Sequence, residues 1–165
     1  MAYTPHYYRG IKVLYFRALL RTLIKVGNLN HNRVLDFGCG SQELRKVLAH
    51  SNYVGYDINP QCSDVRSLDG ITFDVMVANE VFYEMSEQDI VNTLETLRPP
   101  TLVVGISRQG ILNKVGAALL YPAAHTKTII PPKKELEILT RSYRIVARKN
   151  VWFLADVYLL QRIER

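Results

Sequence analysis

The chain contains the stretch VLDFGCGSQELRKVL (34–48), in which an apolar run leads through two glycines into a capped segment. The run Arg33–Phe37 is short and largely apolar, which predicts a buried strand. Gly38 and Gly40 then allow a sharp turn and a close approach of the backbone to a ligand. Ser41 predicts the N-terminal cap of a helix over Gln42–His50. A strand, a glycine loop and a helix in this order are typical of an α/β fold.

Further segments extend this pattern on both sides. We expect strands over 52–57, 73–79 and 101–106, and helices over 10–26, 86–97, 111–120 and 133–140. Two last apolar segments, 143–147 and 151–160, predict an antiparallel hairpin that turns at Arg148-Lys149-Asn150. Continuously apolar strands imply a largely parallel sheet with helices on both faces. No linker or repeat interrupts residues 1–165, so we expect one domain with a basic helical segment at 1–30 and a core at 31–165.

Three of the expected strands end in residues suited to a ligand. In an open α/β sheet, ligands bind at the carboxyl ends of the strands. The first strand ends in the glycine loop, the second in Asp57, which follows Gly40 by 17 residues, and the third in Asn79-Glu80. An acid after the second strand can accept hydrogen bonds from both hydroxyls of a ribose. The set therefore predicts an adenosine-containing ligand.

The residues around the glycine loop disfavour a phosphate-bearing ligand. A dinucleotide fingerprint would need glycine at position 43, where Glu43 stands, and no Gly-Lys-Ser/Thr phosphate loop occurs. Asp36 and Glu43 would repel a pyrophosphate. The same acids would favour a cation, which points to a sulfonium-bearing cofactor.

Four stretches in this order resemble the first four motifs of class I S-adenosylmethionine-dependent methyltransferases. They are VLDFGCGSQELRKVL, YVGYDIN, SDVRSL and FDVMVANEVFYEM, within residues 33–85. A weaker similarity covers PAAHTKTIIPPKKELEILTRSYRIV (122–146), which resembles the stretch before the last strands of small-molecule members. The resemblance implies a Rossmann-like, seven-stranded sheet and an enzyme that moves a methyl group from S-adenosylmethionine to an acceptor by in-line displacement. No metal is implied.

The resemblance also assigns residues to the cofactor. Gly38, Cys39 and Gly40 would line its methionine part, and Asp57 would hold the ribose hydroxyls beside Ile58. The adenine edge would be held by Asp64 and Val65. Three further residues would border the methionine end, namely Asp36, Asn79 and Glu80. Cys39 is expected to pack against the cofactor, because nothing near it in the sequence would activate a nucleophile.

The chain departs from the family pattern at several positions. Gln42 replaces a frequent third glycine, and the short spacing from Asp57 to Asp64 removes the usual helix between the second and third strands. Tyr83-Glu84 stand where many relatives have Glu-His. The chain also has no Asn/Asp-Pro-Pro-Tyr/Phe motif after the fourth strand of the family pattern, and this absence disfavours a methyltransferase that acts on the amino groups of bases. The candidate catalytic residues facing an acceptor are Tyr83, Glu84 and His125.

Composition and charge limit the possible partners. The chain has 165 residues, 48% hydrophobic and 22% charged residues, only two cysteines and no apolar run of membrane-spanning length. These values exclude a disordered chain and a disulfide scaffold, and they predict a cytoplasmic protein. The net charge of +6 is uneven: residues 36–95 sum to −8, whereas the segments before and after them sum to +6 and +8. Arg17, Arg21 and Lys25 form a basic stripe on the helix expected over 10–26.

Several acceptors and one alternative function remain open from the sequence. A small molecule or a lipid is favoured as acceptor, with residues 10–26 contacting a membrane surface from outside the bilayer. An RNA along the basic ends is the second possibility, and a homodimer interface could hold the acceptor. The alternative to an enzyme is a binding or scaffold protein that keeps the methyltransferase fold without turnover.

Overall fold

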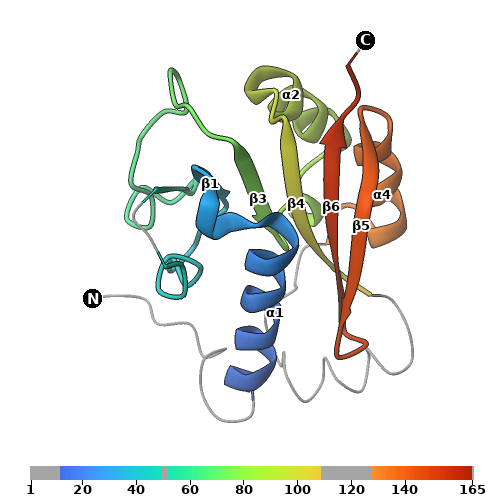
Figure 1. Cartoon of the computed structure of the whole chain (residues 1–165). Coiled ribbons are helices and arrows are strands. Elements are labelled where there is room, and N and C mark those ends of the chain that lie inside the picture. The colour runs from blue at the N-terminus through green and yellow to red at the C-terminus, as the bar shows by residue number, and fades with distance from the viewer. Residues whose placement is uncertain (1–11, 50–51, 109–127, 165) are drawn as a thin grey trace.

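The computed structural model describes residues 12–49, 52–108 and 128–164. They form one six-stranded sheet in the order β2-β1-β3-β4-β6-β5 (Figure 1). The first four strands run parallel, and β6 runs antiparallel to both of its neighbours. The prediction of a mostly parallel α/β sheet closed by an antiparallel hairpin is confirmed. The strands are β1 (Val34–Phe37), β2 (Tyr53–Tyr56), β3 (Val75–Asn79), β4 (Thr101–Ser107), β5 (Tyr143–Val151) and β6 (Ala155–Arg162).

Helices cover both faces of this sheet, as Figure 1 shows. On one face, α1 (Lys12–Gly27) packs against β4, β5 and β6. On the other face lie α2 (Glu87–Leu97) and α4 (Pro132–Thr140), which contact each other. Two 3₁₀ helices complete the described structure, η2 (Leu29–His31) after α1 and η3 (Phe82–Glu84) after β3.

Alternation along the strands divides the core into two layers. Val75 and Val77 of β3 belong to the layer under α1, whereas Met76 and Ala78 belong to the layer under α2 and α4. This follows from the two-residue period of a strand, which sends successive side chains to opposite faces. Each parallel strand is therefore apolar at nearly every position.

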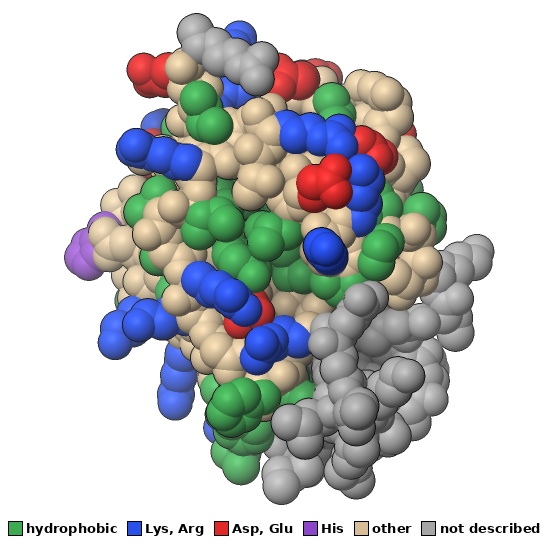
Figure 2. Space-filling view, turned by 90° about the vertical axis from the view of Figure 1, so that its right-hand side faces the viewer, with side chains coloured by type: hydrophobic (Ala, Val, Ile, Leu, Met, Phe, Trp, Pro, Cys, Tyr) green, Lys and Arg blue, Asp and Glu red, His purple; other side chains and the backbone are tan. Residues whose placement is uncertain are grey.

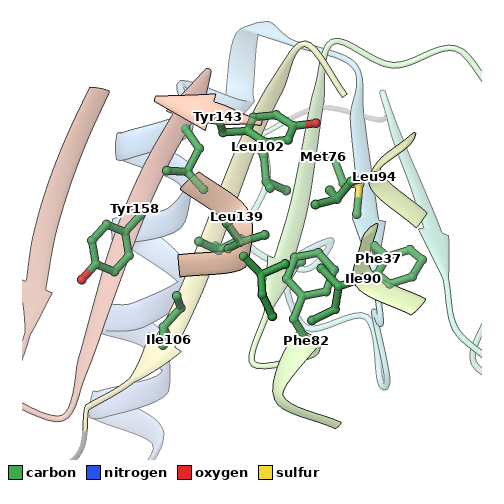
Figure 3. Packing of buried hydrophobic residues seen from close by; sticks show 14 of the residues in the cluster. Phe37, Met76, Phe82, Ile90, Leu94, Leu102, Ile106, Leu139, Tyr143 and Tyr158 are labelled. Carbon is green, nitrogen blue, oxygen red and sulfur yellow. The ribbon is translucent and has the colours of Figure 1, made fainter. Parts of the chain in front are cut away.

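The layer under α2 and α4 is packed by aromatic and aliphatic side chains. In Figure 3, Phe37 and Phe82 lie beside Ile90, and Leu139 lies over the sheet near Leu102. The rings of Phe37 and Phe82 are 6.1 Å apart between centroids. Because Phe37 ends β1 and Phe82 begins η3, this contact fixes η3 close to the loop that follows β1.

Two predicted helix starts are confirmed. Ser86 is the N-cap of α2, and its side-chain oxygen accepts a hydrogen bond from the backbone N–H of Asp89 at 3.1 Å. Pro131 precedes α4, and Pro132 is its first residue. Proline suits the first helical position because its missing N–H would have no partner inside the helix.

The helix expected over 42–50 is wrong, because residues 41–47 form consecutive turns. Gln42 has a left-handed φ of 55°, which interrupts helical backbone at its start. Its side-chain amide donates hydrogen bonds to the Cys62 carbonyl and to Asp64, and Ser41 donates to Glu43 instead of capping. Within this segment Leu44 belongs to the buried core, whereas Val47 is exposed. Tertiary hydrogen bonds therefore replace the helix.

The seven-stranded count is not confirmed, since the described residues form six strands. No strand forms between β2 and β3, where every residue from 57 to 74 is described. β2 is thus an edge strand, and Asp64 occupies its open side. The Asp64 carboxylate accepts a hydrogen bond from the Gly55 N–H at 2.7 Å, and the Asp64 N–H donates to the Gly55 carbonyl at 2.8 Å.

The C-terminal hairpin turns later than expected. β5 continues through Arg148-Lys149-Asn150, and the turn falls at Trp152–Leu154. β5 is an edge strand with most of its side chains exposed, so polar residues can lie within it. The polar triplet therefore marks an exposed strand rather than a turn.

Some expected features lie outside the described residues, including the helix over 111–120 and the first residues of the helix over 10–26. Within the ranges that are described, no helix has the length and hydropathy needed to cross a bilayer.

Candidate functional site

The loop after β1 is held in place by the end of β2. The N–H groups of Gly38 and Cys39 both donate hydrogen bonds to the Tyr56 carbonyl, at 2.7 and 3.0 Å. Gly38 and Gly40 have φ values of +75° and +48°, a region that favours glycine. The two glycines therefore serve different purposes: Gly38 packs against Val81, whereas a side chain at Gly40 would meet no atom within 4 Å.

Gly38→Ala is expected to destabilise the fold more than Gly70→Ala. Both glycines have nearly the same φ, +75° and +73°, so the backbone strain of an alanine is matched. A Cβ at Gly38 would lie 2.4 Å from Val81 Cγ2, whereas a Cβ at Gly70 would meet no atom within 4 Å. We expect the free energy of unfolding to fall by about 1–3 kcal/mol more for Gly38→Ala in urea titrations. Equal losses would contradict the packing of this loop against Val81.

Asp36 lies buried beneath the glycine loop. The Tyr53 hydroxyl donates a 2.7 Å hydrogen bond to its Oδ2 atom. The pKa of Asp36 is raised to about 7, chiefly by burial and also by the negative charges of Asp57 and Asp64, although the Tyr53 hydrogen bond opposes this rise. Asp36 thus gives the floor of the site a carboxyl group that is partly charged near neutral pH.

Asp57 joins the ends of β1 and β2. Its Oδ2 atom accepts a hydrogen bond from the Gly40 N–H at 2.9 Å, and its Oδ1 atom accepts one from the Asn59 N–H at 2.8 Å. This contact brings Asp57 and the glycine loop together. Ile58, the next residue, is 95% exposed.

The Asp64 carboxylate is engaged by the protein itself. Besides Gly55, it accepts hydrogen bonds from both terminal nitrogens of Arg45, each at 3.0 Å, and from Gln42 at 3.1 Å. Burial raises its pKa, but these partners outweigh burial and lower it. A role of this carboxylate at the adenine edge would require these bonds to break. Val65 is half-buried, and its carbonyl accepts a hydrogen bond from Ser63.

Asn79 and Glu80 lie at the end of β3, beside β4. The Asn79 Oδ1 atom is buried, has no hydrogen-bond partner among the described residues and packs against Gly105, where a Cβ would lie 2.1 Å from it. Glu80 has a left-handed φ of 57°, and its Oε1 atom accepts a 2.5 Å hydrogen bond from the Ser107 hydroxyl. β3 therefore ends in a buried amide oxygen without a partner among the described residues, at Asn79, and in a strained backbone at Glu80. Strained residues of this kind are frequent at functional sites.

Two of the three candidate catalytic residues lie in η3. The Tyr83 hydroxyl donates a 3.0 Å hydrogen bond to Glu84 Oε1. The Tyr83 carbonyl accepts hydrogen bonds from the N–H groups of Ile129 and Ile130, which join η3 to the segment before α4. The third candidate, His125, lies outside the described residues.

A cavity of about 560 Å³ opens at this carboxyl edge of the sheet. Six predicted residues line it, whereas Asp36, Cys39, Gly40, Asp64, Val65 and Asn79 lie around it without forming its wall. The six are Gly38, Asp57, Ile58, Glu80, Tyr83 and Glu84. Its apolar end is formed by residues that the sequence did not single out, including Phe37, Tyr56, Leu68, Met85 and Leu97. The cavity thus has an acidic part near the glycine loop and an apolar part near α2.

A smaller hollow of about 190 Å³ lies on the other side of Glu80, between the end of β4, α4 and β6. Ser107 lines it, and its hydrogen bond to Glu80 links the two hollows. Nearby in α4, Glu135 is only 2% exposed, and among the described residues no side chain forms a hydrogen bond with its carboxyl. Burial raises its pKa to about 8, with a further contribution from the charge of Glu80.

Glu135 was missed from the sequence although a signal existed. It lies three and four residues before Ile138 and Leu139, which are both buried, so it belongs to the inward stripe of α4. A charged residue in an apolar stripe is unusual and indicates a functional or structural role.

A larger hollow, of about 840 Å³, lies at the opposite edge of the sheet. It is polar and open, and its lining residues Arg162 and Glu95 pair with each other at 3.1 Å. It contains none of the predicted site residues.

Cys39 behaves as a packing residue. Its Sγ atom donates a weak hydrogen bond to the Cys62 carbonyl at 3.4 Å, and burial raises the pKa of its thiol to about 12. A thiol that stays protonated is a poor nucleophile.

The sequence matches no protein-family model, and no curated protein matches it significantly. Solved structures do resemble it. A protein from Pyrococcus horikoshii OT3 superposes with a TM-score of 0.68 at 12% identity, over 94% of each chain. The 16S rRNA methylase ArmA superposes with a TM-score of 0.61 at 18% identity, over 92% of this chain and 86% of its own.

Magnesium protoporphyrin IX methyltransferase from Synechocystis, solved with bound S-adenosylhomocysteine, gives a TM-score of 0.53 at 16% identity. The match covers 93% of this chain and 85% of that enzyme. At such identities a likeness establishes the fold, which here is the fold of the class I S-adenosylmethionine-dependent methyltransferases.

Proposed function

We propose that this chain, which has the class I methyltransferase fold, binds S-adenosylmethionine in the 560 Å³ cavity and transfers its methyl group to a small-molecule or lipid acceptor. The observation that carries the proposal is the contact between the glycine loop and Asp57 at the mouth of this cavity. It brings a close-approach backbone and a ribose-binding acid together at the carboxyl edge of the sheet, where ligands of this fold class bind.

The residues present fit such a cofactor. The space beyond Gly40 is open, so a ligand can lie against its backbone. Asp36, Asp57 and Glu80 supply negative charge, which suits a sulfonium and opposes a pyrophosphate. The buried Asn79 Oδ1 atom has no partner among the described residues and could accept a hydrogen bond once a ligand rearranges this end of β3.

Each part of the site then has a proposed role. The backbone of Gly38–Gly40 would hold the methionine part, and Asp57 would accept hydrogen bonds from the ribose hydroxyls. Because Asp64 is bonded to Arg45 and Gly55, we assign the adenine side to the wall that includes Tyr56 and Leu68. When bound, S-adenosylmethionine supplies the electrophilic methyl group, and the protein supplies alignment and exclusion of water.

The acceptor side is assigned to the region around Glu80. Tyr83 and Glu84 line the cavity next to it, and the smaller hollow adjoins it through Ser107. Glu135 lies near this region in α4, and burial raises its pKa to about 8, so its carboxyl is mostly protonated at neutral pH and would act as a hydrogen-bond donor rather than as a base. An acceptor that is already nucleophilic would need no base.

Calorimetric titration with S-adenosylmethionine and S-adenosylhomocysteine tests the proposal. We expect the wild type to bind both, and Gly40→Ala to bind at least about tenfold more weakly, because its Cβ would enter the open space beside the cavity, where we place the methionine part of the ligand. Gly70→Ala is the matched control, since it also places alanine at a left-handed φ facing open space. The two variants should lose similar thermal stability.

Two outcomes separate the alternatives. A folded wild type that binds neither compound would contradict the cofactor proposal. Binding without methylation of any lipid, small molecule or RNA acceptor would favour a binding protein on the same fold.

A further inference from the structure

The turn of the β5–β6 hairpin exposes two large aromatic side chains at the functional edge of the sheet. Ser107, the last residue of β4, pairs with Ala155, the first residue of β6, so the turn lies where the parallel strands end. In this turn Trp152 is 50% exposed and Phe153 is 68% exposed. Exposed apolar side chains that gather on one part of the surface often mark a contact site.

The backbone of this turn is strained at both aromatic residues. Trp152 and Phe153 have φ values of +50° and +61°, a left-handed conformation that glycine and asparagine adopt far more readily. The turn is stabilised by Asn150, whose Oδ1 atom accepts a hydrogen bond from the Phe153 N–H at 2.9 Å. The Trp152 ring also lies 6.1 Å from the ring of Tyr15 in α1. The hydrogen bond thus holds the turn, and the contact with Tyr15 places the half-exposed Trp152 ring beside the start of α1.

Other exposed apolar side chains lie at the same edge. Leu14, beside Tyr15 near the start of α1, is 56% exposed, and Ile58, directly after β2, is 95% exposed. Ile129, whose N–H is bonded to the Tyr83 carbonyl, is 59% exposed. We call these residues, together with Trp152 and Phe153, the apolar rim. They are spread along the carboxyl edge of the sheet, from Ile58 after β2, which lines the 560 Å³ cavity, to the turn between β5 and β6.

Basic side chains lie close to part of the apolar rim. Arg17 and Arg21 are exposed on α1, three and seven residues after Leu14, and Lys149 is exposed near the hairpin turn, whereas Lys25, also exposed, lies at the far end of α1, which leads to β1. Among the described residues none of these four forms an ion pair. Figure 2 views the molecule from the side of β5 and α4. It shows hydrophobic side chains projecting at the lower end, with Lys and Arg side chains, and Asp or Glu side chains among them, above. Apolar groups bordered by unpaired bases complement an anionic bilayer, whose headgroups are negative and whose interior is apolar.

We propose that the apolar rim docks this edge of the protein onto an anionic lipid bilayer and presents the cavity to an acceptor dissolved in that bilayer. Trp152 and Phe153 would enter the interface, where tryptophan is enriched, and the bases would contact lipid headgroups. The assignment of the acceptor as a lipid rests on the proposed function, whereas the docking itself does not. Leu14, Ile58 and Ile129 are aliphatic and cannot stack on bases, so this rim suits a bilayer better than RNA.

Fluorescence gives a direct test, because Trp152 is the single tryptophan of the chain. The full chain is mixed with phosphatidylcholine vesicles that contain about one third phosphatidylglycerol, and with pure phosphatidylcholine vesicles. We expect the emission of Trp152 to shift to shorter wavelength with the anionic vesicles and to be quenched by brominated lipid. Flotation of the protein with these vesicles gives the affinity.

Variants separate docking from other causes. Phe153→Ser keeps the tryptophan and should weaken vesicle binding by at least about tenfold. Arg17→Glu combined with Arg21→Glu should weaken it more at low salt than at high salt. Ile163→Ser is the matched control, because Ile163 is an exposed apolar residue at the opposite edge, and it should leave vesicle binding unchanged.

Several results would overturn the inference. These are no change in Trp152 emission with anionic vesicles, a shift that requires RNA, and a shift with rising protein concentration in the absence of lipid. Because these measurements use no cofactor, they are independent of the titration with S-adenosylmethionine. Cofactor binding without vesicle binding would overturn the docking alone, whereas vesicle binding without cofactor binding would overturn the proposed enzyme alone.

Discussion

Asp57→Ala is expected to lower the affinity for S-adenosylmethionine by about 100-fold, measured by calorimetric titration. The carboxylate is the only group assigned to both ribose hydroxyls, and hydrogen bonds to a charged acceptor contribute about 1.5–3 kcal/mol each. The loss should be similar for S-adenosylhomocysteine, because the two compounds share the ribose.

Two further variants identify the cause of that loss. Asp57 also accepts a hydrogen bond from the Gly40 N–H, so its removal could loosen the glycine loop. Asp57→Asn keeps an oxygen acceptor for this bond and should retain thermal stability while still binding the ribose more weakly. Asp69→Ala removes an exposed loop acid bonded to Ser67 and controls for the change in net charge. Equal affinities of Asp57→Ala and wild type would contradict the assignment of the site.

Asp36→Asn is expected to change how stability depends on pH. The pKa of Asp36 is about 7 in the folded protein, chiefly because of burial, against 3.8 for an ordinary aspartate. The unfolded chain therefore releases this proton first, and ionisation of Asp36 opposes folding as the pH rises through this window. The free energy of unfolding of the wild type should carry a loss of up to about 4 kcal/mol between about pH 4 and pH 7. The asparagine variant lacks this loss.

Urea titrations across this pH range, compared between the two proteins, measure the effect. Asp74→Asn is the control, because the pKa of Asp74 is lowered on folding and its ionisation therefore stabilises the folded protein. Asp74 is bonded to Arg33, which lowers its pKa to about 2, so its stabilising charge is lost only when the pH falls below about 4. If the free energy of unfolding depended on pH in the same way in wild type and Asp36→Asn, the pKa of Asp36 would not be raised by folding.

Local sequence predicted most strands well, because buried parallel strands are continuous apolar runs with few alternatives. The same reasoning placed Asp57 next to the glycine loop, since both follow neighbouring parallel strands. It failed where long-range contacts override local preference. The segment after Gly40 has a helical pattern, but the Gln42 side chain bonds to Cys62 and Asp64, about twenty residues away, and turns form instead.

The hairpin and α4 show two other limits of local reasoning. A polar triplet usually marks a turn, yet Arg148-Lys149-Asn150 lie within an exposed edge strand, and the turn contains Trp152 and Phe153. The position of these aromatics follows from pairing with β6, which the local pattern does not encode. Glu135 could have been found from its place in the inward stripe of α4, but its proximity to Glu80 depends on the packing of α4 near the end of β3.

The bonds that Asp64 makes with β2 also affect how this protein meets other chains. An open strand edge exposes unpaired N–H and C=O groups, and these can recruit a strand from another molecule and seed aggregates. Here the N–H and C=O of Gly55, at the open edge of β2, are already bonded to Asp64, and Arg45 keeps a charge beside them. An incoming strand would have to displace a carboxylate and its guanidinium partner. At Gly55, the edge strand of the described sheet thus offers an incoming chain a carboxylate instead of free backbone groups.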